Sequence, residues 1–457
     1  MSDPFRQWLS DVEPSKGSRY CGPLVDEGRG SDIEFDSSTL ELLVDGAAIG
    51  FAGTHDATRS AAPIGLRVLG RQATQEPLAR FFVHVNNYCN LRCTYCYEQD
   101  LPYHTIREEI LSDAKAAEVC RFITAVSGGS DSVHITYFGG EPLLSFHVIQ
   151  KFHQGLRASL NGKRCTAGIV TNGTILTDAH LAFLREHDFE VMVSFDGTRT
   201  NHECQRPGPN GVSTYDLIVA NIGRLVAAKM RKVSIRITYG QASLDLLDSI
   251  KTVVAFGPDD VAFRPIMDGT PVNRWADAER HAGALHDVVR YYFEQLLERQ
   301  PVIINNVHEV VRRILFRQPK TDYCEWGRIC SITPDGDLYP CTHFVGMPEF
   351  RMGDTGSPEM DRTLQAELLE ATRIGNLPCQ SCSVKHVCGG GCRGCSQHVY
   401  ADIFREDDYC EARRDITYAV IRQLAAAWRN GRWRESSAFV ESLMGQGHRK
   451  HSCDRFS

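Results

Sequence analysis

Residues 78 to about 300 alternate between two hydrophobic patterns. Short apolar runs rich in Val, Ile and Phe predict strands at 80–87, 132–138, 166–171, 190–195, 233–239 and 260–266. Segments with apolar positions three and four residues apart predict helices at 107–126, 147–160, 178–187, 214–229, 243–256 and 277–299. Six strand-then-helix units predict a parallel sheet, because each right-handed crossover returns the chain to the same strand direction. We therefore predict an α/β fold, a partial (β/α)6 TIM-like barrel over residues 78–319, with the chemistry on the loops after the strands.

The regions on either side of this barrel follow other patterns. Residues 1–77 are broken by Gly and Ser, and their one apolar stretch, 40–51, predicts either a helix or a pair of strands. Residues 320–412 are short Gly-, Pro- and Cys-rich pieces with too little apolar periodicity to be held by burial alone, so metal ligation must supply part of their stability. Residues 413–457 predict an amphipathic helix over 413–429 that packs on the body, then a polar tail whose end, from 447, is frayed.

Composition changes this picture mainly through cysteine. Of 17 cysteines, nine lie between Cys324 and Cys410. The chain begins without a signal peptide's charged-then-apolar order and has no apolar run of about 18 residues, so we expect a cytoplasmic protein with no membrane partner. In that compartment clustered cysteines indicate metal or cluster ligation rather than disulfides. The net charge of -7 argues against a nucleic-acid partner.

A first group of cysteines follows the first predicted barrel strand. Cys89, Cys93 and Cys96 have the spacing C-x3-C-x2-C, and three thiolates in one short loop can bind three irons of a [4Fe–4S] cluster and leave the fourth open. A zinc site or unpaired core cysteines are the alternatives. A structural zinc site takes four ligands, and this loop supplies three with no histidine beside them, so a cluster is favoured.

This loop and three later motifs resemble the radical S-adenosylmethionine (SAM) superfamily. An aromatic residue, Tyr95, precedes the last cysteine, and the motifs GGEP, TNGT and SFDGT follow the next three predicted strands. The resemblance implies SAM binding and its cleavage to a 5′-deoxyadenosyl radical. The GGEP motif would hold the methionyl amino group, the TNGT and SFDGT residues would lie toward the ribose and substrate, and Arg206 would face the carboxylate. The residues so implied are Tyr95, Gly139, Gly140, Glu141, Pro142, Thr171, Asn172, Ser194, Asp196 and Arg206.

The second group of cysteines resembles the SPASM domain, a C-terminal extension of radical SAM enzymes with two auxiliary [4Fe–4S] clusters. The resemblance assigns the first auxiliary cluster to Cys324, Cys330, Cys341 and Cys392, and the second to Cys379, Cys382, Cys388 and Cys410. The protein would then carry three [4Fe–4S] clusters. A pair of zinc knuckles is the alternative. Cys395 is an extra cysteine, interpreted as a buried bystander or an alternative ligand.

The resemblance implies that the protein is a maturase, an enzyme that oxidatively modifies a ribosomally made peptide. Its partners would be a peptide with a leader sequence, for which residues 1–77 are the candidate recognition region, and a flavodoxin- or ferredoxin-type electron donor. Sulfatase maturation to formylglycine is less favoured, because that group has an aspartate directly after the auxiliary ligand of the YPC hairpin and this chain has Thr342. His343 is a possible substitute base. Oxidation of a small molecule and a non-catalytic zinc-binding scaffold remain further alternatives.

Overall fold

The computed structural model describes residues 19–26, 29–36, 38–49, 78–100, 109–320, 323, 329–357, 360–371 and 373–450. The predicted ligand Cys324 lies outside these residues, as do most of the N-terminal segment and the last seven residues of the chain.

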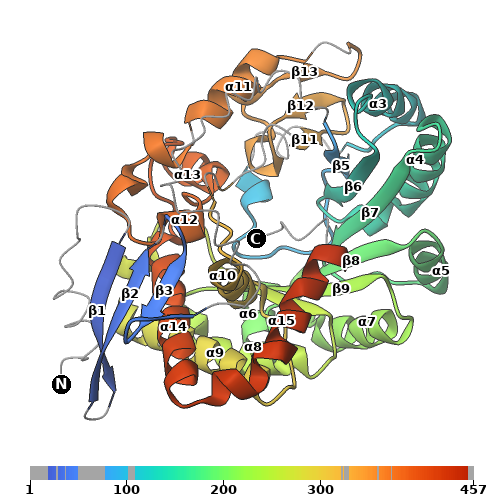
Figure 1. The fold of residues 1–457 in the computed structure, drawn as a ribbon. Coiled ribbons are helices and arrows are strands. Elements are labelled where there is room, and N and C mark those ends of the chain that lie inside the picture. The colour runs from blue at the N-terminus through green and yellow to red at the C-terminus, as the bar shows by residue number, and fades with distance from the viewer. Residues whose placement is uncertain are drawn as a thin grey trace.

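Six parallel strands form the centre of the molecule and pair in sequence order (Figure 1). They are β5 (Arg80–Asn86), β6 (Ser132–Gly139), β7 (Arg164–Thr171), β8 (Phe189–Ser194), β9 (Lys232–Tyr239) and β10 (Asp260–Pro265). The helices that follow them are α3 (Asp113–Val126), α4 (Phe146–Ser159), α5 (Asp178–Glu186), α6 (Arg199–Gln205), α7 (Tyr215–Ala227), α8 (Leu246–Val254), α9 (Ala278–Leu297) and α10 (Asn305–Leu315). In Figure 1 the helices α3, α4, α5 and α7 lie outside the arc of strands. The predicted partial (β/α)6 barrel is confirmed.

The alternation of side chains along β9 shows why these runs form barrel strands. Val233, Ile235 and Ile237 are at most 2% exposed and belong to the apolar core. Successive side chains of a strand point to opposite faces, so the intervening positions face the barrel interior. One of these is Arg236, whose charge interacts with Tyr97 of the cysteine loop. The barrel interior is therefore partly polar, as a substrate site requires.

The cysteine-rich region extends the barrel sheet. Strand β11 (Ile329–Ile332) lies parallel to β5, with Cys330 opposite Phe81, and continues into the antiparallel strands β12 (Asp337–Tyr339) and β13 (Gly353–Asp354). The helices of this region are α11 (Arg362–Ala371), α12 (Lys385–Cys388) and α13 (Arg393–Tyr400). Because β11 is adjacent to the first barrel strand, the predicted auxiliary region lies beside the strand that leads into the first cysteine loop.

The N-terminal segment forms a separate antiparallel sheet in the order β1 (Arg19–Asp26), β2 (Arg29–Asp36), β3 (Glu41–Val44), β4 (Ala47–Ile49). Of the two possibilities for 40–51, the pair of strands is right. Asp45 and Gly46 both have positive φ, the conformation that a two-residue hairpin turn of the Asp-Gly type needs.

Two helices end the described chain. The predicted helix is α14 (Cys410–Arg429), which packs against α9 and α10. Because it begins at Cys410, the predicted boundary between residues 412 and 413 falls inside it. A further helix, α15 (Arg432–Lys450), was not predicted, and the expectation of a frayed end from residue 447 stays a prediction. Its buried residues Trp433, Val440 and Met444 are spaced seven and four apart, so a polar sequence still has one apolar face. No helix within the described ranges has the length and hydrophobicity to cross a membrane.

Candidate active site

A cavity of about 390 Å³ opens at the carboxyl ends of β5 to β8. The three cysteines of the first group line it together, from the loop after β5. Seven of the ten residues that the resemblance assigned to SAM also line it: Tyr95, Gly139, Gly140, Thr171, Asn172, Ser194 and Arg206. The other three, Glu141, Pro142 and Asp196, are buried and do not line it. Motifs that are far apart in sequence thus meet around one space.

The two glycines of the GGEP motif make room for the cysteine loop itself. A Cβ on Gly139, whose φ is +132°, would lie 2.2 Å from the backbone oxygen of Asn86. A Cβ on Gly140 would lie 2.2 Å from the oxygen of Tyr88 and 2.9 Å from the nitrogen of Cys89. All three distances are too short for a real Cβ, so only glycine allows β6 and the cysteine loop to approach this closely. These two glycines, which the resemblance assigned to SAM, therefore also let the cysteine loop lie against β6.

Glu141 fixes the end of the next strand. Its buried carboxylate accepts hydrogen bonds from the backbone nitrogen of Leu143 (3.0 Å), the hydroxyl of Thr171 (2.8 Å) and the backbone nitrogen of Asn172 (2.7 Å). Burial raises the pKa of Glu141 to about 6, although these three hydrogen bonds oppose the shift. The carboxylate therefore holds the TNGT motif in place. Pro142 begins the short 3-10 helix Pro142–Ser145 directly behind it.

Asn172 connects the end of β7 to the cysteine loop. Its Nδ2 donates to Oδ1 of Asn90 at 2.9 Å and lies 3.6 Å from Sγ of Cys89. Its Oδ1 accepts from the backbone nitrogen of Thr174 at 2.9 Å, which fixes the orientation of the amide. Sequence reasoning did not select Asn90; its only signal was its position within the C-x3-C spacing.

Tyr95, Asp196 and Arg206 form a second connection to the loop. The Tyr95 hydroxyl donates to Asp196 at 2.8 Å, and Nη1 of Arg206 donates to that hydroxyl at 2.5 Å. Burial raises the pKa of Asp196, and the Arg206 guanidinium opposes the shift. Nε of Arg206 is buried and has no hydrogen-bond partner among the described residues, although the side chain lines the cavity. An anion in the cavity could satisfy this nitrogen.

The thiols of the loop are in surroundings that suit a bound metal. Burial raises the pKa of Cys89 to about 11 and also raises that of Cys93, where Arg206 opposes the shift. Without a cation both thiols are protonated at neutral pH, and binding of a metal would displace the protons. Three thiols on one cavity, next to the unsatisfied nitrogen of Arg206, fit a three-cysteine iron–sulfur cluster with an anionic ligand beside it.

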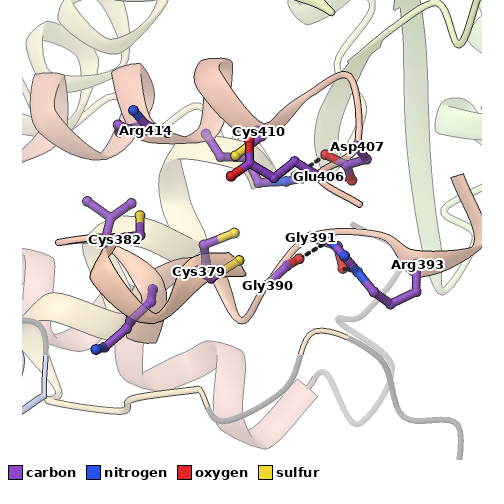
Figure 2. Close-up of a pocket in the computed structure, with 13 residues that line it drawn as sticks. Cys379, Cys382, Gly390, Gly391, Arg393, Glu406, Asp407, Cys410 and Arg414 are labelled. Atoms are coloured by element: carbon purple, nitrogen blue, oxygen red, sulfur yellow. Dashed lines mark hydrogen bonds and ion pairs between the residues drawn. The ribbon is translucent and has the colours of Figure 1, made fainter. Parts of the chain in front are cut away.

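The four cysteines assigned to the second auxiliary cluster surround another cavity (Figure 2). Cys379, Cys382, Cys388 and Cys410 all line it. Figure 2 shows Cys410, from α14, across this space from Cys379. Burial raises the pKa of Cys379 to about 11, and the neighbouring Cys388 adds to the shift. The charged lining residue Arg414 lies close enough to Cys410 for their charges to interact. The structure thus brings together a complete set of four thiols, the number that a fully protein-bound cluster needs.

The set assigned to the first auxiliary cluster is only partly described. Cys330 is buried on β11, Cys341 follows β12, and Cys392 precedes α13. The thiol of Cys395 lies 3.9 Å from Nε2 of His343.

His343, the possible base, does not line the 390 Å³ cavity. Its ring lies 4.7 Å from that of Tyr97, which does. Burial lowers the pKa of His343, so the ring is neutral at neutral pH. Its role as a base stays a prediction.

Comparison with known proteins agrees with this arrangement. Residues 83–243 match the model of the Radical SAM superfamily. The serine-type anaerobic sulfatase-maturating enzyme of Klebsiella aerogenes is 25% identical over 318 residues, which are 66% of this chain and 76% of that protein. The structure of native anSMEcpe with bound AdoMet and Kp18Cys peptide has a TM-score of 0.63 at 20% identity, covering 77% of this chain and 99% of the other. Streptococcus suis SuiB bound to its precursor peptide SuiA has a TM-score of 0.51 at 15% identity, covering 74% and 77%.

The two structural likenesses show a shared fold, and the family match covers the strands and loops that surround the cavity. The prediction of a radical SAM enzyme is confirmed at the level of this domain: residues 83–243 form a radical SAM domain around the cavity.

Proposed function

We propose that this radical SAM maturase modifies a residue of a ribosomally made peptide by oxidation. The observation that carries the proposal is the 390 Å³ cavity, where three thiols meet the ends of four adjacent parallel strands. In a barrel of this type the reaction takes place at that end of the strands. Two similar proteins support the substrate class: the Klebsiella aerogenes relative is a sulfatase-maturating enzyme, and SuiB binds a precursor peptide.

Different residues of the cavity would hold the cluster and SAM. A [4Fe–4S] cluster bound by Cys89, Cys93 and Cys96 would keep one iron open for SAM and, when reduced, supply the electron that cleaves it to a 5′-deoxyadenosyl radical. The unsatisfied nitrogen of Arg206 suits the carboxylate of SAM. Ser194, at the end of β8, offers a hydroxyl to the cavity for the ribose.

The second set of four cysteines would hold an electron-transfer cluster. An oxidative modification leaves a substrate radical with one more electron to remove, and a cluster in the C-terminal region could accept it. The charges of Arg413 and Arg414 near Cys388 and Cys410 would stabilise a reduced, more negative cluster. We propose a flavodoxin- or ferredoxin-type protein as the electron donor.

The N-terminal sheet is the proposed binding site for a peptide leader. Strand β1 is at the outer edge of this sheet, as Figure 1 shows, and β4, at the opposite edge, contacts α14. An edge strand offers unpaired backbone groups to an extended peptide, which can bind by strand addition.

Maturation of a sulfatase is the second candidate, favoured by the Klebsiella aerogenes relative. Against it stands Thr342, which occupies the position directly after Cys341 where the resemblance expects an aspartate base. A hydroxyl of ordinary pKa cannot accept a proton from the substrate as a carboxylate can. We therefore place peptide maturation first.

A direct test compares the two candidates in one assay. The reduced, reconstituted enzyme is incubated without oxygen with SAM and either a sulfatase-derived peptide or the short peptides encoded beside its gene. Mass spectrometry is then used to look for a loss of two hydrogens or another defined mass change. Modification of a neighbouring peptide alone supports the proposal, and conversion of the sulfatase peptide to formylglycine supports the second candidate. A triple variant tests the cluster itself, with Cys89→Ala, Cys93→Ala and Cys96→Ala in one chain. If this variant still forms 5′-deoxyadenosine, both candidate functions are wrong.

A further inference from the structure

Three metal-binding side chains converge at the edge of the auxiliary region. A ring nitrogen of His343 and the Sγ atoms of Cys392 and Cys395 all lie within 4.8 Å of one another. Among the described residues no other three donor atoms of His, Cys, Asp or Glu residues come this close together. Cys392 was assigned to the first auxiliary cluster, whereas Cys395 had no assigned role.

The local fold brings the three together. Cys392 and Cys395 are three residues apart at the start of α13, so their side chains lie on the same face of the first turn. His343 comes from the 3-10 helix Thr342–Phe344 after β12 and packs on α13 at Gly394. A Cβ on Gly394 would lie only 2.7 Å from Cβ of His343, so glycine at this position is what lets the imidazole reach the two thiols.

A guanidinium and an aromatic ring lie on either side of the three donor atoms. Nη1 of Arg264 lies 4.0 Å from Sγ of Cys395. On the other side the ring of Tyr97 packs against His343. Nδ1 of His343 is buried without a hydrogen-bond partner among the described residues, while Nε2 faces Sγ of Cys395.

The distances match a single metal ion better than separate corners of a cluster. With bonds of about 2.3 Å to sulfur and about 2.0 Å to nitrogen, two tetrahedral ligands of one ion lie about 3.5 Å apart. The observed separation of Cys395 Sγ and His343 Nε2 is 3.9 Å. In a four-cysteine cluster each thiolate binds a different iron, so its sulfur ligands lie further apart.

We propose that His343, Cys392 and Cys395 together bind one first-row transition-metal ion. Mixed thiolate and imidazole ligands suit both iron and zinc. The ion would be a mononuclear iron or zinc, because an iron of a four-iron cluster already carries three sulfides and takes one protein ligand. Cys392 would then bind this ion instead of the first auxiliary cluster.

The test measures metal rather than turnover. The full-length protein is reconstituted anaerobically, and iron and zinc are counted per chain in the wild type, Cys395→Ser and His343→Gln. Pulsed EPR of the oxidised protein, in which [4Fe–4S]2+ clusters are diamagnetic, then detects the ¹⁴N hyperfine coupling of an imidazole bound to ferric iron. The matched controls are Cys204→Ala and His147→Gln, which alter an exposed cysteine and an exposed histidine far from the site in sequence.

Two results would support the site. A ¹⁴N coupling in the wild type that His343→Gln removes identifies iron, and one zinc per chain that both variants lose identifies zinc. The controls should match the wild type in either case. The site is disproved if the wild type shows neither a ¹⁴N coupling nor a stoichiometric zinc. This wild-type result does not depend on how the variants fold. Formation of 5′-deoxyadenosine is measured in parallel; its absence would contradict the proposed function but not the metal site.

Discussion

The Tyr95 hydroxyl donates a 2.8 Å hydrogen bond to Oδ2 of Asp196, which joins the middle of the cysteine loop to the end of β8. Oδ1 of the same carboxylate accepts from the backbone nitrogen of Thr238, at the end of β9. The backbone nitrogen of Thr94 also donates to the oxygen of Gln205 at 2.9 Å. The position of the cysteines is thus set from the far side of the cavity as well as from β5.

Removal of the Tyr95 hydroxyl should loosen this arrangement. In Tyr95→Phe, Asp196 loses a donor and Arg206 loses the acceptor 2.5 Å from Nη1, both in buried surroundings. A buried polar group left unsatisfied costs about 1–3 kcal/mol, and we expect a loss of unfolding free energy in that range with a higher KM for SAM. Urea unfolding and SAM cleavage assays measure the two effects. Tyr215→Phe, a part-buried tyrosine of α7 outside the cavity lining, is the control, and equal values for both variants would contradict the prediction.

A methyl group on Gly140 should displace the cysteine loop. Its Cβ would lie 2.2 Å from the backbone oxygen of Tyr88, and backbone cannot move aside as a flexible side chain can. We expect Gly140→Ala to bind about four fewer irons per chain and to lose SAM cleavage. Gly155→Ala in α4 is the matched control, because its Cβ would meet nothing within 4 Å and alanine favours a helix by about 1 kcal/mol. Normal iron content in Gly140→Ala would show that the loop tolerates the displacement.

The side-chain amide of Asn172 should raise the reduction potential of the cluster bound by the first group of cysteines. Its Nδ2 lies 3.6 Å from Sγ of Cys89, and hydrogen bonds to cluster sulfurs raise the reduction potential. Asn172→Leu replaces this donor with an apolar group of similar shape and adds no charge. If the contact is worth about 1 kcal/mol, the midpoint potential falls by about 40 mV, and an EPR-monitored redox titration detects the shift. Asn90→Ala removes the other partner of Nδ2 but keeps the donor, so it should leave the potential closer to that of the wild type.

The barrel could be predicted because its strands and helices differ in period, and the motifs could be placed because parallel strands bring their carboxyl ends together. The sequence could not show contacts between distant segments of the chain, because the hydrophobic period of a segment does not say which other segment it packs against. The strand β11 is four residues long and pairs with β5 across some 250 residues. The helix α15 has few apolar residues, which hid its buried face around Trp433. His343 was selected from its distance to a cysteine in sequence, and its closeness to Cys395 depends on the packing of two short helices.

Glu141 should make the stability of the protein depend on pH in an unusual direction. Burial raises its pKa from 4.5 to about 6, so the folded state binds a proton more tightly than the unfolded state. Stability from this group is therefore present at low pH and is lost as pH rises through 6; between pH 5 and 7.5 the loss is about 1 kcal/mol. Because Glu141→Gln cannot titrate, its unfolding free energy relative to the wild type should rise by that amount over the same range, measured by urea unfolding. Glu118→Gln is the control: the hydrogen bond with Lys115 lowers the pKa of Glu118 from 4.5, so the difference from the wild type should stay flat between pH 5 and 7.5 and change only at lower pH. Parallel curves for the wild type and Glu141→Gln would mean that the three hydrogen bonds to this carboxylate fully offset its burial.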